Sequence, residues 1–215
     1  MDLSSIYASH GLLLSGLVKT VYLSVIAIAA STVLGAVVGF LRAARIPVLG
    51  AVLRLYLEVF RGTPLLVQLL FIYFGAAYLG IGGVTTLVGA FVGLTLYEGA
   101  IASEIFRAGV EAVPKAQREA ARVLGLGRWT TSVRVVLPQA VKVILPALIG
   151  QEISLVKDTS LAAVIGFPEL VNQSQSVIGN INQPMFVLLV AGCLYFIVCY
   201  PMSIGSRILE RRAGR

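Results

Sequence analysis

Residues 119–138 read EAARVLGLGRWTTSVRVVLP, and they form the longest strongly polar interval in a very apolar chain. Just before them, Pro114 suits the first turn of a helix, because the N–H that proline lacks has no partner at that position. Residues 115–124 are good helix formers, and Gly125 falls where a left-handed helix cap is expected. An apolar stripe follows helical spacing through the segment: Ala116, Ala120, Val123 and Leu124. The sequence therefore predicts a short amphipathic helix, a glycine stop, a second short segment and a long helix opening at Pro138.

The composition on either side of this stretch is that of a membrane protein. Of 215 residues, 58% are hydrophobic and only 13% are charged, with a mean hydropathy of +0.92. A soluble domain is about half apolar and about a quarter charged. The net charge of +7 does not indicate nucleic-acid binding, because the cations line one side of the predicted membrane protein.

Five apolar segments are expected to cross the membrane as helices, since a crossing needs about 20 mostly apolar residues. They lie at about residues 12–41, 62–78, 84–105, 139–156 and 184–206. The polar loop at 108–138 separates the third from the fourth. We therefore predict an all-α polytopic membrane protein with a single transmembrane domain over residues 1–215. Glycines spaced four apart predict close helix packing in the first and third segments: Gly35 and Gly39, Gly89 and Gly93.

The distribution of lysine and arginine predicts the orientation. Fifteen of the 17 lie in the first connection, in the loop at 108–138 with its flanking helix ends, or in the C-terminal tail: Arg42, Arg45, Arg54, Arg61, Arg107, Lys115, Arg118, Arg122, Arg128, Arg134, Lys142, Arg207, Arg211, Arg212 and Arg215. The opposite connections, 79–84 and 161–183, contain none. The positive-inside rule makes the basic side cytoplasmic. The N-terminus is therefore expected outside and the C-terminus in the cytoplasm.

Several motifs resemble one family of transporters. Glu119-Ala120-Ala121, three residues, Gly125, nine residues and then VVLP at 135–138 resembles the EAA loop of bacterial ABC importer permeases, with only Val135 departing from an isoleucine. RGTPLLVQ at 61–68, SEIFRAGV at 103–110, LPQA at 137–140 and KDTSL at 157–161 resemble permeases for polar amino acids, the histidine, glutamate, glutamine and arginine group. The likeness covers about residues 12–206. Ala102, Ser103 and Glu152 depart from the family pattern near the expected substrate path, which leaves the substrate open.

The resemblance implies a type I ABC importer permease fold, with five transmembrane helices and a short cytoplasmic coupling helix. The loop would dock on the ATPase subunit through Glu119, Ala120, Ala121 and Gly125. The implied partners are a dimer of ATPase subunits, a second permease subunit that is identical or paralogous, an extracytoplasmic solute-binding protein, a polar amino acid and membrane lipid. The expected location is the bacterial cytoplasmic (inner) membrane.

Five polar residues inside the third and fourth segments are candidates for substrate binding: Glu98, Glu104, Gln151, Lys157 and Asp158. Such groups are costly in a membrane, by at least about 2.5–3.5 kcal/mol at a helix centre, so they face the protein interior, a partner or water. An amino acid needs a cation for its carboxylate, which Lys157 offers, and acceptors for its ammonium. The alternative is internal ion pairing, which Glu104 and Arg107 could form across one helical turn.

The sequence shows no catalytic machinery and no metal site. It has no GxxxxGK[ST] stretch, so ATP is expected to bind the partner subunit and this chain to need no cofactor. A single histidine permits neither a Ser-His-Asp set nor a His/Cys metal cluster. The remaining alternatives are an importer permease for another small solute, a secondary carrier, and an intramembrane enzyme that uses Glu98 and Glu104. Secondary carriers usually contain internal repeats, and none is visible here.

Overall fold

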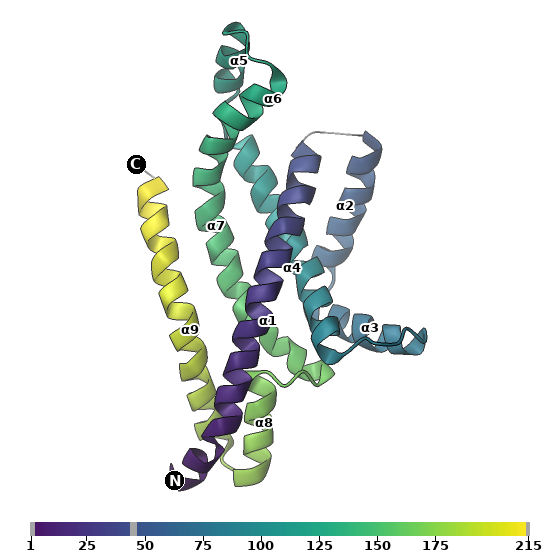
Figure 1. Cartoon of the computed structure of the whole chain (residues 1–215), viewed down its shortest axis with the longest axis vertical. Coiled ribbons are helices and arrows are strands. Elements are labelled where there is room, and N and C mark those ends of the chain that lie inside the picture. The colour runs from purple at the N-terminus through teal and green to yellow at the C-terminus, as the bar shows by residue number, and fades with distance from the viewer. Residues whose placement is uncertain (1–2, 44–46, 214–215) are drawn as a thin grey trace.

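The computed structural model describes residues 3–43 and 47–213, which form helices and no strand (Figure 1). The elements in chain order are α1 (Leu3–Ala43), α2 (Pro47–Gly62), α3 (Leu65–Tyr78), α4 (Thr86–Glu111), α5 (Lys115–Val123), α6 (Arg128–Thr131), a π-helical turn (Ser132–Val136), α7 (Leu137–Asp158), a 3₁₀ helix (Thr159–Ile165), α8 (Leu170–Ile181) and α9 (Pro184–Ala213). Arg45 and Arg215, which enter the charge pattern above, lie outside the described residues.

Four described helical segments are long and apolar enough to cross a membrane: His10–Ala43, Thr86–Glu111, Arg128–Ile165 and Pro184–Leu209. A fifth crossing exists if α2 and α3 count as one span that is bent by 106°. The predicted all-helical membrane fold is therefore confirmed, and α2 and α3 are the bent pair that would form its second crossing. The segment predicted at 62–78 corresponds to α3 alone, but 14 residues of helix reach only about 21 Å across a core of about 30 Å.

The corner between α2 and α3 is held by a glutamine. Pro64 disfavours helical geometry at Thr63, so α2 ends there and α3 begins after it. The side-chain amide of Gln68 then reaches back, donating to the backbone oxygens of Phe60 at 2.8 Å and Thr63 at 3.0 Å. These carbonyls belong to the end of α2 and would otherwise lack donors. The RGTPLLVQ stretch thus builds a fixed bend.

Glycines bring α1 and α4 together over much of their length. A Cβ added at Gly35 would lie 2.5 Å from the Ala102 Cβ, and one at Gly39 would lie 2.6 Å from the Ser103 oxygen. Gly99 on α4 is equally close to the Leu34 side chain of α1. The close packing predicted for Gly35 and Gly39 is therefore confirmed. Small residues let the two helices approach closely. Packing contacts then hold them together, because apolar lipid provides no hydrophobic driving force for helix association.

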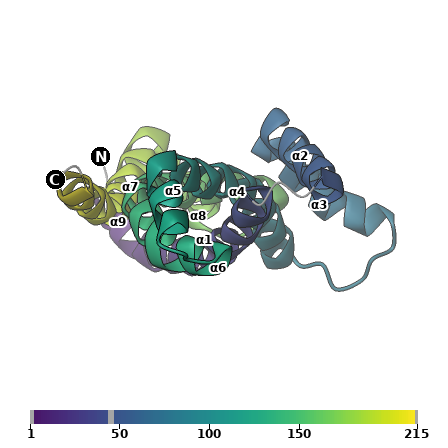
Figure 2. The ribbon, with the colours of Figure 1, turned by 90° about the horizontal axis from the view of Figure 1, so that it is seen from above.

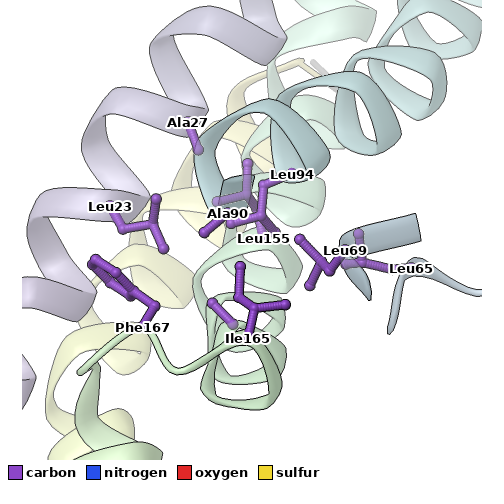
Figure 3. Packing of buried hydrophobic residues seen from close by; sticks show 10 residues of the cluster. Leu23, Ala27, Leu65, Leu69, Ala90, Leu94, Leu155, Ile165 and Phe167 are labelled. Atoms are coloured by element: carbon purple, nitrogen blue, oxygen red, sulfur yellow. The ribbon is translucent and has the colours of Figure 1, made fainter. Parts of the chain in front are cut away.

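The main apolar core lies where α1, α3, α4 and α7 approach the 3₁₀ helix (Figure 3). Figure 3 shows ten of its residues converging, among them Leu23 from α1, Leu69 from α3, Leu94 from α4 and Leu155 from α7, all fully buried. This core fixes the relative positions of the helices that carry the polar residues discussed below.

The two ends of the molecule differ. In Figure 1, α5 and α6 project at one end, on the side where the C-terminus lies, whereas the N-terminus and α8 lie at the other end. Seen from above in Figure 2, α9 flanks α7 on one side of the bundle, and α2 and α3 stand out on the other. An odd number of crossings is consistent with termini at opposite ends.

Candidate functional site

Polar residues of α4 and α7 meet inside the bundle. Gln151 Nε2 on α7 donates a hydrogen bond of 2.8 Å to Glu98 Oε2 on α4. Asp158 lies seven residues beyond Gln151, on the same helix face, and its carboxyl also faces that of Glu98. Glu98 is only 1% exposed. Three of the five predicted substrate-binding residues are therefore brought together.

Glu152 belongs to the same group, although it was not among the predicted site residues. Its Oε1 accepts a hydrogen bond of 2.9 Å from Thr32 Oγ1 on α1, and its carboxyl is close enough to Glu98 to interact electrostatically. We call Glu98, Gln151, Glu152 and Asp158 the carboxyl cluster. The signal in the sequence was a carboxylate inside an otherwise apolar helical segment.

Two carboxylate oxygens of the cluster are buried without a hydrogen-bond partner in the described part of the chain: Oε1 of Glu98 and Oε2 of Glu152. The hydroxyl of Thr95, one turn before Glu98, is also buried without a hydrogen-bond partner among the described residues. Most buried polar groups in proteins have a partner. In each glutamate, one oxygen is thus held by a neighbouring side chain and the other is free to accept a hydrogen bond.

Glu104 is engaged by arginines instead. Its Oε1 pairs with Arg42 of α1 and lies 3.7 Å from Arg61 of α2, while its Oε2 is 2.7 Å from Arg107. Arg107 also pairs with Glu111 at 2.6 Å. The predicted pair of Glu104 and Arg107 is confirmed, and this network ties α1, α2 and α4 together. A role for Glu104 in substrate binding stays a prediction.

Lys157 lies on a different side of α7 from the cluster. Its side chain is exposed and lines a cavity of about 460 Å³ between α7 and α9, together with Tyr195, Tyr200 and Arg207. No ion pair of Lys157 occurs among the described residues, although its charge acts on the neighbouring Asp158. Its predicted contact with the substrate carboxylate stays a prediction.

The polar loop has the predicted local structure. Helix α5 covers Lys115–Val123, and Gly125 follows with φ of +78°, the left-handed conformation expected of a glycine cap. Glu119 and Ala120 are exposed, whereas Ala121 is 3% exposed and packs inward. Of the four residues expected to dock on an ATPase, Ala121 therefore supports the loop from inside.

The tip of this loop presents large apolar side chains to the outside. Val123 is 87% exposed, Leu124 78% and Trp129 80%. The predicted apolar stripe thus includes two side chains, Val123 and Leu124, that are largely exposed. Clustered exposed apolar side chains with a polar surround mark interaction sites. We call the exposed residues of α5, α6 and the turn between them the docking loop.

These features together define the class of protein. A bundle of membrane-crossing helices that encloses a polar cluster and carries a docking loop at one end is a membrane transport permease. Among the described residues, no group of three or more His, Cys, Asp or Glu is placed to hold a metal ion.

Comparison with known proteins supports this class. Residues 31–215 match the family model for binding-protein-dependent transport system inner membrane components. A probable glutamine ABC transporter permease protein of Bacillus subtilis is 37% identical over 217 residues, covering 99% of both chains. The glutamine transport system permease protein of Escherichia coli K12 is 36% identical, covering 98% of this chain and 97% of its own.

Solved structures agree. The crystal structure of an amino acid ABC transporter with histidines superposes with a TM-score of 0.92 at 32% identity, covering 99% of both chains. An inward-facing methionine ABC transporter has the same fold, with a TM-score of 0.81 at 22% identity over the full length of both chains. This chain belongs to the family of binding-protein-dependent transport system inner membrane components, as the sequence motifs predicted. It is an ABC importer permease, so the intramembrane enzyme and the secondary carrier are set aside.

Proposed function

We propose that this chain takes up a polar amino acid, delivered by an extracytoplasmic binding protein, through an importer driven by ATP. The observation that carries the proposal is the carboxyl cluster between α4 and α7, since its carboxylates and the Gln151 amide can form strong hydrogen bonds with the polar groups of an amino acid. The similarity to permeases named for glutamine and other amino acids supports the same class of substrate.

Energy would come from a separate subunit. The chain has no phosphate-binding GxxxxGK[ST] stretch, so a partner ATPase would bind and hydrolyse ATP, and the permease itself would need no cofactor. The docking loop offers that partner an exposed charge at Glu119, a small exposed Ala120 and a turn fixed by Gly125, with Ala121 supporting the helix. Exposed Trp129 extends the contact surface.

Two permease subunits, identical or paralogous, would enclose the path, because five crossings are few for one chain to surround a substrate. Each would sit on one ATPase subunit of a dimer. The N-terminus would face outward and the C-terminus the cytoplasm. The basic residues on the docking loop and the position of both termini in Figure 1 support this orientation.

Within the path, Glu98, Gln151 and Asp158 would contact the substrate, as their proximity supports. Lys157, whose charge acts on the neighbouring Asp158 of the cluster, would receive the substrate carboxylate. Glu104, which is held by the arginines described above and lies closer to the docking loop, would also contribute to substrate binding.

Uptake into proteoliposomes tests the proposal. The permease reconstituted with its ATPase should accumulate labelled amino acid only with ATP inside and the binding protein outside. The permease alone should accumulate nothing. Accumulation by the permease alone, without nucleotide, would contradict the proposed coupling to ATP. Uptake of another class of solute, with no amino acid transported, would contradict the substrate.

A further inference from the structure

The carboxyl cluster concentrates three acidic groups in the membrane core, and the one described cation whose charge acts on it, Lys157, acts on Asp158 and forms no ion pair with it. Glu98 is 1% exposed and Glu152 is 7% exposed, and Asp158 is half-buried beside Glu98. The ion pairs found among the described residues involve Glu104 and Glu111 but none of these three carboxyls. Buried charge without a partner is strongly unfavourable, so such a group signals a missing partner.

The two buried glutamates are oriented in the same way. Gln151 holds Oε2 of Glu98 by a hydrogen bond, and Thr32 holds Oε1 of Glu152. The other oxygen of each carboxylate is buried and has no donor. Each glutamate is thus fixed by a side chain from a neighbouring helix and keeps one oxygen to accept from a donor that the chain does not supply.

We infer that Glu98 and Glu152 bind a positively charged side chain, so that the importer carries a cationic amino acid. This inference rests on the proposed function and names its substrate class. A guanidinium or ammonium group would donate a hydrogen bond to a free oxygen of the cluster and compensate acidic charge there, and such charge-assisted bonds are about twice as strong as neutral ones. Gln151 and Asp158, which are partly exposed, lie at the edge of the cluster, and the two glutamates lie deeper.

Other amino acids fit the cluster less well. The side-chain amide of glutamine could donate to one free oxygen, but it would leave the acidic charge uncompensated. The carboxylate of glutamate would face the buried acidic groups directly, and opposed like charges are an effective means of rejection. The inferred substrate class therefore differs from glutamine, for which several of the similar permeases are named.

Equilibrium binding to the purified permease–ATPase complex tests the inference, because leaving out the binding protein isolates the specificity of the permease. Arginine and lysine should bind more tightly than glutamine, and glutamate should bind weakest. A preference for glutamine or glutamate in the wild-type complex would overturn the inference, and this measurement needs no variant. Absence of ATP-dependent uptake of every amino acid would instead reject the proposed function.

Single-residue variants test which carboxyl groups set the preference for arginine over glutamine. Glu98→Gln and Glu152→Gln should each weaken arginine binding by about ten- to one-hundred-fold relative to glutamine, the range expected for one hydrogen bond to a charged group. Glu111→Gln is the matched control, since Glu111 is an exposed carboxyl on the same helix as Glu98, and it should leave the order of substrates unchanged. An unchanged order in both cluster variants would overturn the inference.

Thr32→Val provides a further measurement if either glutamine variant fails to fold. It keeps every acidic group but removes the donor that orients Glu152. Arginine binding should fall about threefold or more relative to glutamine, less than in the glutamine variants, because the Glu152 carboxylate stays and only its orientation is lost. Equal arginine-to-glutamine ratios in wild type and Thr32→Val would remove Glu152 from the site.

Discussion

Gln68 donates a hydrogen bond of 2.8 Å from its side-chain amide to the backbone oxygen of Phe60, and this contact ties the first turn of α3 to the last turn of α2. The two helices meet at 106°. A side chain therefore supplies the donors that the last carbonyls of a membrane helix would lack after an abrupt turn. In lipid such carbonyls are costly to leave without a donor.

Gln68→Leu should destabilise the protein. Two backbone carbonyls lose their donor, at a cost of about 1–3 kcal/mol for an unsatisfied buried group. Thermal denaturation in detergent, followed by circular dichroism, should show a midpoint lower by roughly 2–10 °C. Gln175→Leu on the exposed face of α8 is the control and should leave the midpoint unchanged. Equal midpoints for Gln68→Leu and wild type would mean that the bend does not depend on Gln68.

Gly35→Ala should separate α1 from α4. The added methyl would lie 2.5 Å from the Ala102 Cβ, which neither helix can accommodate without moving. We expect a loss of about 1–3 kcal/mol, the usual cost of overpacking. Gly205→Ala on α9 meets no atom within 4 Å, so its midpoint should stay at or above that of wild type. Full stability of Gly35→Ala would contradict the close packing.

The sequence predicted the parts of the fold that depend on a short stretch of neighbouring residues. Apolar length predicted the helices, and Pro114 and Gly125 predicted the bounds of α5, because each acts on its own stretch of backbone. The corner at Thr63 was missed because the Gln68 side chain secures it through the carbonyl of Phe60, eight residues earlier, and because the amphipathic α2 resembles a polar connection in the sequence. The pair of Arg42 and Glu104 joins residues 62 apart, and Thr32 and Glu152 are 120 apart. Such contacts follow from packing, which the sequence alone does not give.

Gly125→Val should lower both transport and the ATP hydrolysis that substrate stimulates. A β-branched residue at φ of +78° is strained by about 1–2 kcal/mol or more, so the turn would change and displace α5. Amino acid uptake and substrate-stimulated ATP hydrolysis should both fall, while the variant still inserts into the membrane. Gly80→Val is the matched control, because Gly80 also has a positive φ, +70°, in open space but lies after α3, away from the docking loop. Unchanged uptake by Gly125→Val would remove this turn from the mechanism.

Cysteine labelling can test directly which end of the protein faces the cytoplasm. In a variant without Cys193 and Cys199, a single cysteine at Gly127 should react with a membrane-impermeant thiol reagent only from the cytoplasmic side, as the basic loop predicts. A cysteine at Asn180, exposed at the opposite end, should react from outside in intact cells. The reverse pattern would invert the proposed topology.

Lys157→Met should lower uptake of every amino acid without changing their order. The proposed contact is with the α-carboxylate, which all amino acids share, so its loss does not discriminate among side chains. Uptake of labelled arginine, glutamine and glutamate by cells expressing the complete importer measures this. Lys19→Met on α1 is the control, as the other cation of the outer half. Normal uptake by Lys157→Met would exclude Lys157 from the path.

The docking loop connects the same two helices that hold the carboxyl cluster. Helix α4 covers about 20 Å from Glu98 to Glu111 just before the loop, and α7 follows the loop after the π-helical turn and reaches Gln151. If the proposed ATPase partner displaced the loop, it would displace α4 and α7, which are joined by the hydrogen bond between Gln151 and Glu98. An unequal displacement of the two helices would then change the geometry of the carboxyl cluster.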